Sequence, residues 1–125
     1  MDKKKKVMIV EDDDVLADAL NHSLQDEGYE LFTAIDGEEA ERMILQEVPD
    51  LILLDLLLPV KNGFEVLKVM RQNPITKDIP VVILTNYEES ATKDEGEKLG
   101  VKEYIVKAKM PISEIPKMVK RYLPA

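Results

Sequence analysis

The sequence predicts a doubly wound α/β fold, in which helices cover both faces of a five-stranded parallel sheet. Five apolar segments recur about every two dozen residues, at 7–10, 29–34, 51–54, 80–84 and 104–106, the pitch of a repeated strand–helix unit. The first, third and fourth are nearly continuous Val, Ile and Leu, as expected of strands buried on both faces. The second mixes in polar residues, so we expect it at an edge of the sheet.

Helical patterns fill the intervals between these segments. Apolar residues at helical spacing run from Leu16 to Leu24, from Ala40 to Ile44, from Phe64 to Met70 and from Ile112 to Tyr122. Gly28, Pro49 and the pair Asn73-Pro74 stop the first three patterns, because glycine and proline seldom continue a helix. Alternating strands and helices predict a parallel sheet with right-handed crossovers.

The interval 88–99 is the weakest of the predicted helices. Ala91 and Leu99 are its only hydrophobic residues, and Gly96 interrupts it. Because most helical stability comes from burying an apolar face, we expect this helix to be marginal. It is either an exposed helix or a mobile switching element.

Length and composition exclude several classes of protein. The 125 residues suit one domain, and because the chain ends at Pro124-Ala125 we expect residues 1–125 to form a single domain without an output domain. A net charge of −8 argues against direct binding of nucleic acid. The absence of cysteine excludes thiolate chemistry. Neither an export signal nor an apolar run of roughly 18 residues is present, so we expect a cytoplasmic protein without a membrane span.

Polar residues follow four of the five predicted strands. Glu11 and Asp12 follow the first strand, Asp55 the third, Thr85 the fourth and Lys107 the fifth. Sites in such sheets lie beyond the carboxyl ends of the strands, so these residues converge on one edge. Three carboxylates packed together repel one another unless a cation intervenes. Mg²⁺ prefers oxygen ligands and tolerates a site with few of them.

Asp55 is the only charged residue in the segment 51–59. A charge in an apolar run is costly unless it is paired or functional. It could cap a helix or form a buried ion pair with Lys107. A carboxylate beside a metal, a lysine and a hydroxyl instead suits phosphoryl transfer, in which the protein positions groups and neutralises charge. The product would be an aspartyl phosphate on Asp55.

These residues together resemble the receiver domains of bacterial two-component response regulators. The motifs that carry the resemblance are Val10-Glu11-Asp12, Asp55 with Pro59 and Gly63, Ile83-Leu84-Thr85, and Tyr104-Ile105-Val106-Lys107. They occur in the family's order over essentially the whole chain. The resemblance implies a flavodoxin-like (βα)5 fold with strand order 2-1-3-4-5.

The resemblance also implies a metal site and a phosphorylation site. Asp12 and Asp55 would ligate Mg²⁺ or Mn²⁺ directly, Glu11 would act through water, and the main-chain carbonyl of Leu57 would complete the protein ligands. A sensor histidine kinase or phosphotransfer protein would supply the phosphoryl group to Asp55. The chain would then be a switch rather than an enzyme, apart from slow loss of its own phosphoryl group.

Three further residues have roles implied by the resemblance. Thr85 and Lys107 would contact the phosphoryl oxygens and so belong with Asp55 in the catalytic set. Tyr104 would change rotamer as Thr85 moves toward the phosphate; otherwise it is simply a half-buried aromatic on an edge strand. An unidentified downstream protein would read the change on the surface of the fourth helix, fifth strand and fifth helix.

Two positions depart from the family pattern. Ala108 follows Lys107 where receivers have a proline joined by a cis bond, and a cis bond without proline costs roughly 3 kcal/mol, so we expect a trans bond and an altered loop. Asn86 replaces the small residue that usually follows the switch threonine and would narrow access to Asp55. The chain could therefore be a pseudo-receiver, an adaptor that binds partners without being phosphorylated.

Two enzyme or carrier classes fit less well. Haloacid dehalogenase-like phosphatases also use an aspartate and Mg²⁺, but they need a second Asp two positions after the nucleophile, where this chain has Leu57. Flavodoxin-type carriers need a phosphate-binding loop after the first strand, where this chain has acids.

The single histidine, His22, lies on a predicted helix away from the strand ends, so we expect no phosphohistidine relay through it.

Overall fold

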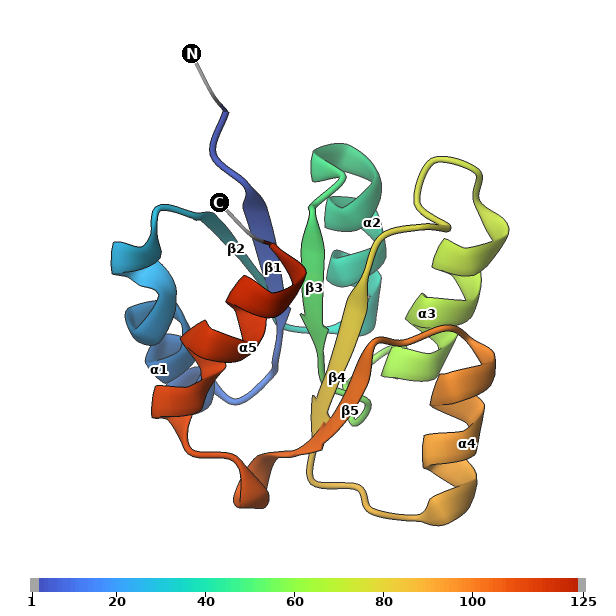
Figure 1. The fold of residues 1–125 in the computed structure, drawn as a ribbon. Coiled ribbons are helices and arrows are strands. Elements are labelled where there is room, and N and C mark those ends of the chain that lie inside the picture. Colours follow the sequence, from blue (N-terminus) through green and yellow to red (C-terminus); the bar gives the residue numbers. More distant parts are fainter. Residues whose placement is uncertain (1–2, 124–125) are drawn as a thin grey trace.

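The computed structural model describes residues 3–123, which contain a five-stranded sheet and five α-helices (Figure 1). Pro124 and Ala125, on which the expectation about the end of the chain rests, lie outside the described residues. The strands are β1 (Lys6–Val10), β2 (Glu30–Ala34), β3 (Leu51–Leu54), β4 (Val81–Thr85) and β5 (Glu103–Val106). The helices are α1 (Asp14–Leu24), α2 (Gly37–Glu47), α3 (Gly63–Gln72), α4 (Ser90–Lys98) and α5 (Ile115–Tyr122).

The sheet is parallel throughout and has the order β2-β1-β3-β4-β5. The predicted doubly wound, flavodoxin-like fold is therefore confirmed. β2 lies at an edge, as its mixed composition predicts, and most of its residues are half-buried or exposed. Two expected boundaries shift slightly, because Tyr29 and Pro80 lie just before β2 and β4 rather than in them.

Helices cover the two faces of the sheet unequally. α1 and α5 pack on one face, and α2, α3 and α4 lie on the other (Figure 1). Alternate residues of each central strand point to opposite faces, so Val7 and Ile9 join one core cluster and Met8 and Val10 join the other. The central strands are thus buried on both sides, which explains their near-continuous apolar sequences.

α4 contacts the sheet through residues other than those its sequence suggests. Ala91 is exposed, and Leu99 is half-buried just beyond the last residue of the helix. The buried residues are instead Thr92 and Gly96, and a Cβ on Gly96 would lie 3.2 Å from Cδ1 of Ile83. Two small residues rather than apolar ones thus form the inner face of α4, and its marginal stability stays a prediction.

The first three helices begin at the edge of the sheet where the predicted site residues lie. Asp13, Asp36 and Asn62 cap α1, α2 and α3, and the side chain of each accepts a hydrogen bond from a main-chain N–H of the first turn. α4 and α5 have no such side-chain cap. α5 also begins later than the pattern from Ile112 suggests, because a 3₁₀ turn at Ile112–Glu114 precedes it.

Within residues 3–123, no helix is both long enough and apolar enough to cross a membrane.

Candidate functional site

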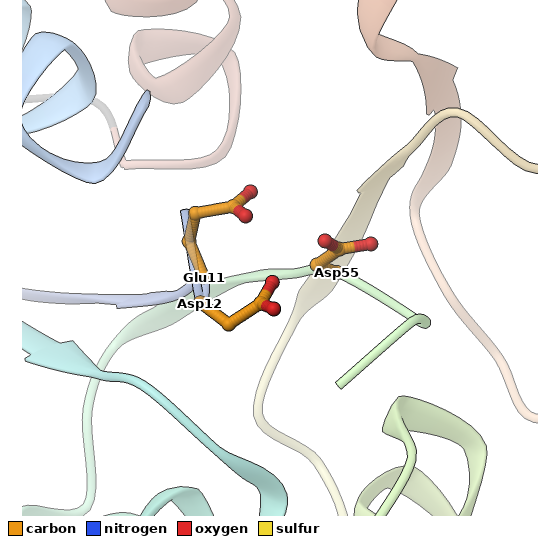
Figure 2. A group of neighbouring side chains, drawn as sticks. All are labelled: Glu11, Asp12 and Asp55. Carbon is orange, nitrogen blue, oxygen red and sulfur yellow. The ribbon is translucent and has the colours of Figure 1, made fainter. Parts of the chain in front are cut away.

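Three carboxylates meet at the carboxyl edge of the sheet. Glu11 and Asp12 directly follow β1, and Asp55 directly follows β3, the strand beside it. One oxygen of each lies within 4.8 Å of the others, and Figure 2 shows Glu11 and Asp12 reaching toward Asp55. Glu11 and Asp55 are buried, with 2% and 4% of their surface exposed, whereas Asp12 is open to solvent. The site is therefore an acidic pocket with one accessible carboxylate.

Main-chain hydrogen bonds fix the backbone under these carboxylates. The N–H of Glu11 donates to the carbonyl of Ala34 at 3.0 Å, and the N–H of Asp55 donates to the carbonyl of Val10 at 3.1 Å. The strand ladder thus extends one residue beyond both strands. Gly63, at the start of α3, packs so closely that a Cβ there would overlap the main-chain carbonyl of Asp55. The backbone of Asp55 is held from both sides.

Lys107 brings the end of β5 into the same cluster. Its amine lies 2.6 Å from Oε1 of Glu11 and 2.9 Å from Oδ2 of Asp55, and 15% of its side chain is exposed. One ammonium therefore pairs with two buried carboxylates. The convergence expected from the strand ends is present for these residues.

The charges in the pocket are unbalanced. Burial raises the pKa of Glu11 above its ordinary value, and the nearby Asp55 charge adds to this, although hydrogen bonds from Lys107 and from the N–H of Asp13 oppose it. Burial alone would lower the pKa of Lys107, but its hydrogen bonds to Glu11 and Asp55 outweigh burial and raise it. One cation faces three carboxylates. A hard divalent cation with oxygen ligands fits this donor set and this excess of negative charge.

Leu57 contributes its main chain to the pocket. Its N–H donates to Oδ1 of Asp55 at 3.2 Å, while 57% of the residue is exposed to solvent. The structure therefore places the backbone of Leu57 next to the Asp55 carboxylate. The apolar side chain of Leu57 is largely exposed, so packing in the core does not explain why this residue is a leucine.

Thr85 and Tyr104 both contact Tyr87. Thr85 is fully buried at the end of β4, and its hydroxyl oxygen accepts a hydrogen bond from the N–H of Tyr87 at 3.4 Å. The phenol of Tyr104, on β5, donates to the carbonyl of Tyr87 at 2.5 Å. The two residues expected to switch together thus share one neighbour in the loop after β4.

Sequence reasoning missed a hydrogen bond between the two positions that depart from the family pattern. The N–H of Ala108 donates to Oδ1 of Asn86 at 3.2 Å. Proline has no N–H and could not make this bond. The Lys107–Ala108 bond is trans, as expected, since residues 3–123 contain no cis peptide. The two departures from the family pattern are therefore in direct contact, which neither position reveals when it is considered alone.

The fold and the acidic pocket at its carboxyl edge are the defining features of one class of signalling domain. The chain belongs to the response regulator receiver domain family, whose model matches residues 7–120. Receiver domains are signalling switches of two-component systems rather than enzymes in the usual sense.

Relatives of known sequence or structure support this assignment. The chain is 36% identical over 102 residues to the phosphate regulon transcriptional regulatory protein PhoB of Rhizobium meliloti (strain 1021). The match covers 82% of this chain but only 45% of that protein. The response regulator Rcp1, whose Mn²⁺-bound form has been solved, is 31% identical in sequence to this chain. Its structure has a TM-score of 0.87, and the match covers 97% of this chain and 96% of that one. The phosphorylated cyanobacterial phytochrome response regulator RcpA is 32% identical, with a TM-score of 0.87 over 98% and 96%.

Proposed function

We propose that this chain is a phospho-accepting switch in which Asp55 receives a phosphoryl group from a phosphohistidine of a sensor histidine kinase or phosphotransfer protein. The observation that best supports this is the Lys107 amine, which bridges Glu11 and Asp55 beside the exposed Asp12. A carboxylate oxygen of Asp55 attacks phosphorus and forms the new P–O bond. The P–N bond breaks, and the leaving imidazole nitrogen keeps the electron pair and takes up a proton.

Four residues fit a divalent cation, Mg²⁺ or Mn²⁺. Asp12 and Asp55 would supply carboxylate oxygens, Glu11 would act through a water, and Leu57 would supply its main-chain carbonyl. Bound there, the cation would neutralise oxygens of the transferring phosphoryl group. That the similar protein Rcp1 has been solved with Mn²⁺ bound supports this proposal.

Lys107 and Thr85 would contact the phosphoryl group once it is attached, and Tyr104 would respond indirectly. The Lys107 amine would exchange its contact with the Asp55 carboxylate for one with a phosphoryl oxygen, while Glu11 continues to hold it. The Thr85 hydroxyl would move toward a second phosphoryl oxygen and donate a hydrogen bond to it. This movement would disturb its contact with the N–H of Tyr87. Because Tyr104 bonds the same residue, it would respond to the motion.

We further propose that residues 1–125 form one receiver domain, and that the signal leaves it as altered binding of a downstream protein to the surface of α4, β5 and α5. α4 buries only Thr92 and Gly96 and lacks a side-chain cap, so moving it breaks few contacts. The basic side chains of α5 already pair with acidic neighbours, as Lys120 does with Glu27 and Arg121 with Glu103. The partner would therefore respond to α4 rather than to free charge on α5.

The proposal is tested by incubating the protein with acetyl phosphate and measuring its intact mass. The mass should rise by one phosphoryl group with Mg²⁺ present, but not after chelation of the metal, and not in Asp55→Asn. A protein that stays unmodified while remaining folded would instead be the pseudo-receiver adaptor. Addition that is indifferent to the chelator would remove the metal from the proposal.

A further inference from the structure

The loop between β3 and α3, residues 55–62, carries two of the proposed metal ligands and lies against the start of α2. Asp55 begins this loop and Leu57 follows two residues later. The contacts between the loop and α2 centre on three residues, Gly37 and Glu41 on the helix and Lys61 in the loop. We call these three residues the brace.

The side chains of the brace form an ion pair that is largely shielded from solvent. The amine of Lys61 donates to Oε2 of Glu41 at 2.5 Å, with 34% and 18% of the two side chains exposed. The hydrogen bond to Glu41 raises the pKa of Lys61, so its amine stays protonated at neutral pH. The other oxygen of Glu41 is buried and has no hydrogen-bond partner among residues 3–123. Lys61 is thus the only cation that compensates this carboxylate within the described residues.

The backbone contact of the brace depends on a missing side chain. A Cβ on Gly37 would overlap the main-chain carbonyl of Lys61, so only glycine lets the loop come this close to α2. The N–H of Gly37 also donates to the carbonyl of Pro59 at 3.3 Å. Backbone and side-chain contacts therefore hold the same stretch of loop, residues 59–61, against the first turns of one helix.

The braced stretch is strained. Val60 has a φ of +69°, the left-handed region that β-branched residues rarely adopt, and 75% of the residue is exposed. Its own side chain therefore does little to stabilise this conformation. The N–H of Lys61 donates back to the carbonyl of Pro59 at 2.8 Å and closes a tight turn around Val60. Such strain persists only where the surroundings impose it, and here the brace holds Pro59 and Lys61, the residues on either side of Val60.

We propose that Glu41 and Lys61 are positioning residues for the metal site: by holding residues 59–61, they keep the carbonyl of Leu57 and the carboxylate of Asp55 where a divalent cation can use both. Neither residue touches the cation. The inference rests on the proposed function, because it requires that Glu11, Asp12 and Asp55 bind Mg²⁺. By linkage, a cation that is bound better with the brace intact must also strengthen the brace.

An effect of charge and an effect of position predict different Mg²⁺ affinities for variants of Lys61 and Glu41, so the two can be distinguished by experiment. If the two residues acted on the metal only through their charge, Lys61→Met would tighten Mg²⁺ binding and Glu41→Gln would weaken it. A positioning role requires that both variants weaken it. It also requires that the double variant bind Mg²⁺ no more weakly than either single variant, since each removes the same ion pair.

The experiment measures the Mg²⁺ dissociation constant by calorimetry for the wild type, Glu41→Gln, Lys61→Met and the double variant. Disruption of groups that orient metal ligands commonly weakens binding by about tenfold or more, and we expect roughly threefold to tenfold here because the brace acts through the backbone. Lys61→Arg, which keeps the pairing, should bind nearly as the wild type does. Glu47→Gln is the matched control, because Glu47 lies on the same helix and pairs with Lys6 at similar exposure, 27% and 34%.

The outcomes separate the inference from the proposed function. If the wild type binds Mg²⁺ and Asp12→Asn does not, the metal site stands. Unchanged binding in the brace variants, opposite effects of Glu41→Gln and Lys61→Met, or equal weakening in Glu47→Gln would then each overturn the positioning role alone. A folded wild type that binds no Mg²⁺ would overturn the proposed function, and the inference with it.

Discussion

The amine of Lys107 lies 2.9 Å from Oδ2 of Asp55 and so joins two strands that are not neighbours in the sheet. β4 separates β3 from β5, and the lysine side chain spans the end of that strand. The same amine reaches Glu11 at the end of β1. One side chain thus neutralises charge from two strands in the middle of the sheet.

Replacing Lys107 with Met should destabilise the metal-free protein by about 3 kcal/mol, because Glu11 and Asp55 remain buried without a cationic partner. Mg²⁺ should restore much of this loss, since the cation takes over the neutralisation. The measurement is urea unfolding with and without Mg²⁺. Lys109→Met is the control: Lys109 pairs with Glu88 in the open, 71% and 51% exposed, and its loss should matter little. A metal-free Lys107→Met as stable as the wild type would contradict this.

Asp12→Asn should have the opposite effect on the metal-free protein. It removes one of three mutually repelling carboxylates, so the free energy of unfolding without metal should rise. The wild type should gain about 2.7 kcal/mol when free Mg²⁺ exceeds its dissociation constant by roughly a hundredfold, and the variant should gain almost nothing. Thermal or urea unfolding at several Mg²⁺ concentrations measures both. Equal Mg²⁺ stabilisation of the two proteins would exclude Asp12 as a ligand.

The strand ends could be predicted well from the sequence, and so could the meeting of the residues that follow them at one edge of the sheet. Val7–Val10 and Leu51–Leu54 are continuous apolar runs that end at a charge, and a parallel sheet brings those ends together whatever the details of its helices. The acidic pocket follows from topology alone. The roles of its residues in metal binding and phosphorylation stay predictions.

Contacts between loops could not be predicted in the same way. Lys61 and Glu41 belong to no motif, and their pairing depends on how closely Gly37 lets the loop approach α2. The bond between Asn86 and Ala108 likewise requires two loops to be placed first. Such contacts depend on tertiary packing, on which local periodicity carries no information.

The phosphoryl group on Asp55 should be lost slowly. In receivers the residues two beyond the acceptor Asp and two beyond the switch Thr flank the path of the attacking water, and here they are Leu57 and Tyr87. Both are exposed, at 57% and 38%, yet neither carries a carboxylate or amide to orient that water. Because positioning of the nucleophile is much of what a protein contributes to this reaction, hydrolysis should be near its background.

The decay of phosphorylated protein after removal of the donor measures this lifetime. Leu57→Asn combined with Tyr87→Glu should shorten it, because the pair supplies polar groups along the path of the water. A wild-type half-life of seconds would contradict the prediction, because it would show that the protein already orients the attacking water. A double variant that decays no faster than the wild type would show that the two positions have no kinetic role.

Gly63→Ala should destabilise the protein by about 2 kcal/mol or more, since the added methyl overlaps the carbonyl of Asp55 and must push α3 away from β3. Gly28→Ala is a suitable comparison. Gly28 has a φ of +86°, and a Cβ added there would meet no atom within 4 Å, so the substitution adds only backbone strain of about 1 kcal/mol. Urea unfolding distinguishes the two. Equal losses would mean that close packing at Gly63 contributes nothing beyond ordinary strain.

Reductive trapping tests the central proposal most directly. Borohydride converts an aspartyl phosphate to homoserine, and peptide mass spectrometry then locates the altered residue. After incubation with acetyl phosphate and Mg²⁺, we expect homoserine at position 55 and at no other aspartate, and none in protein kept without a phosphodonor. Homoserine at Asp12 or elsewhere, or a gain of phosphoryl mass without any homoserine, would contradict the assignment of Asp55 as the acceptor.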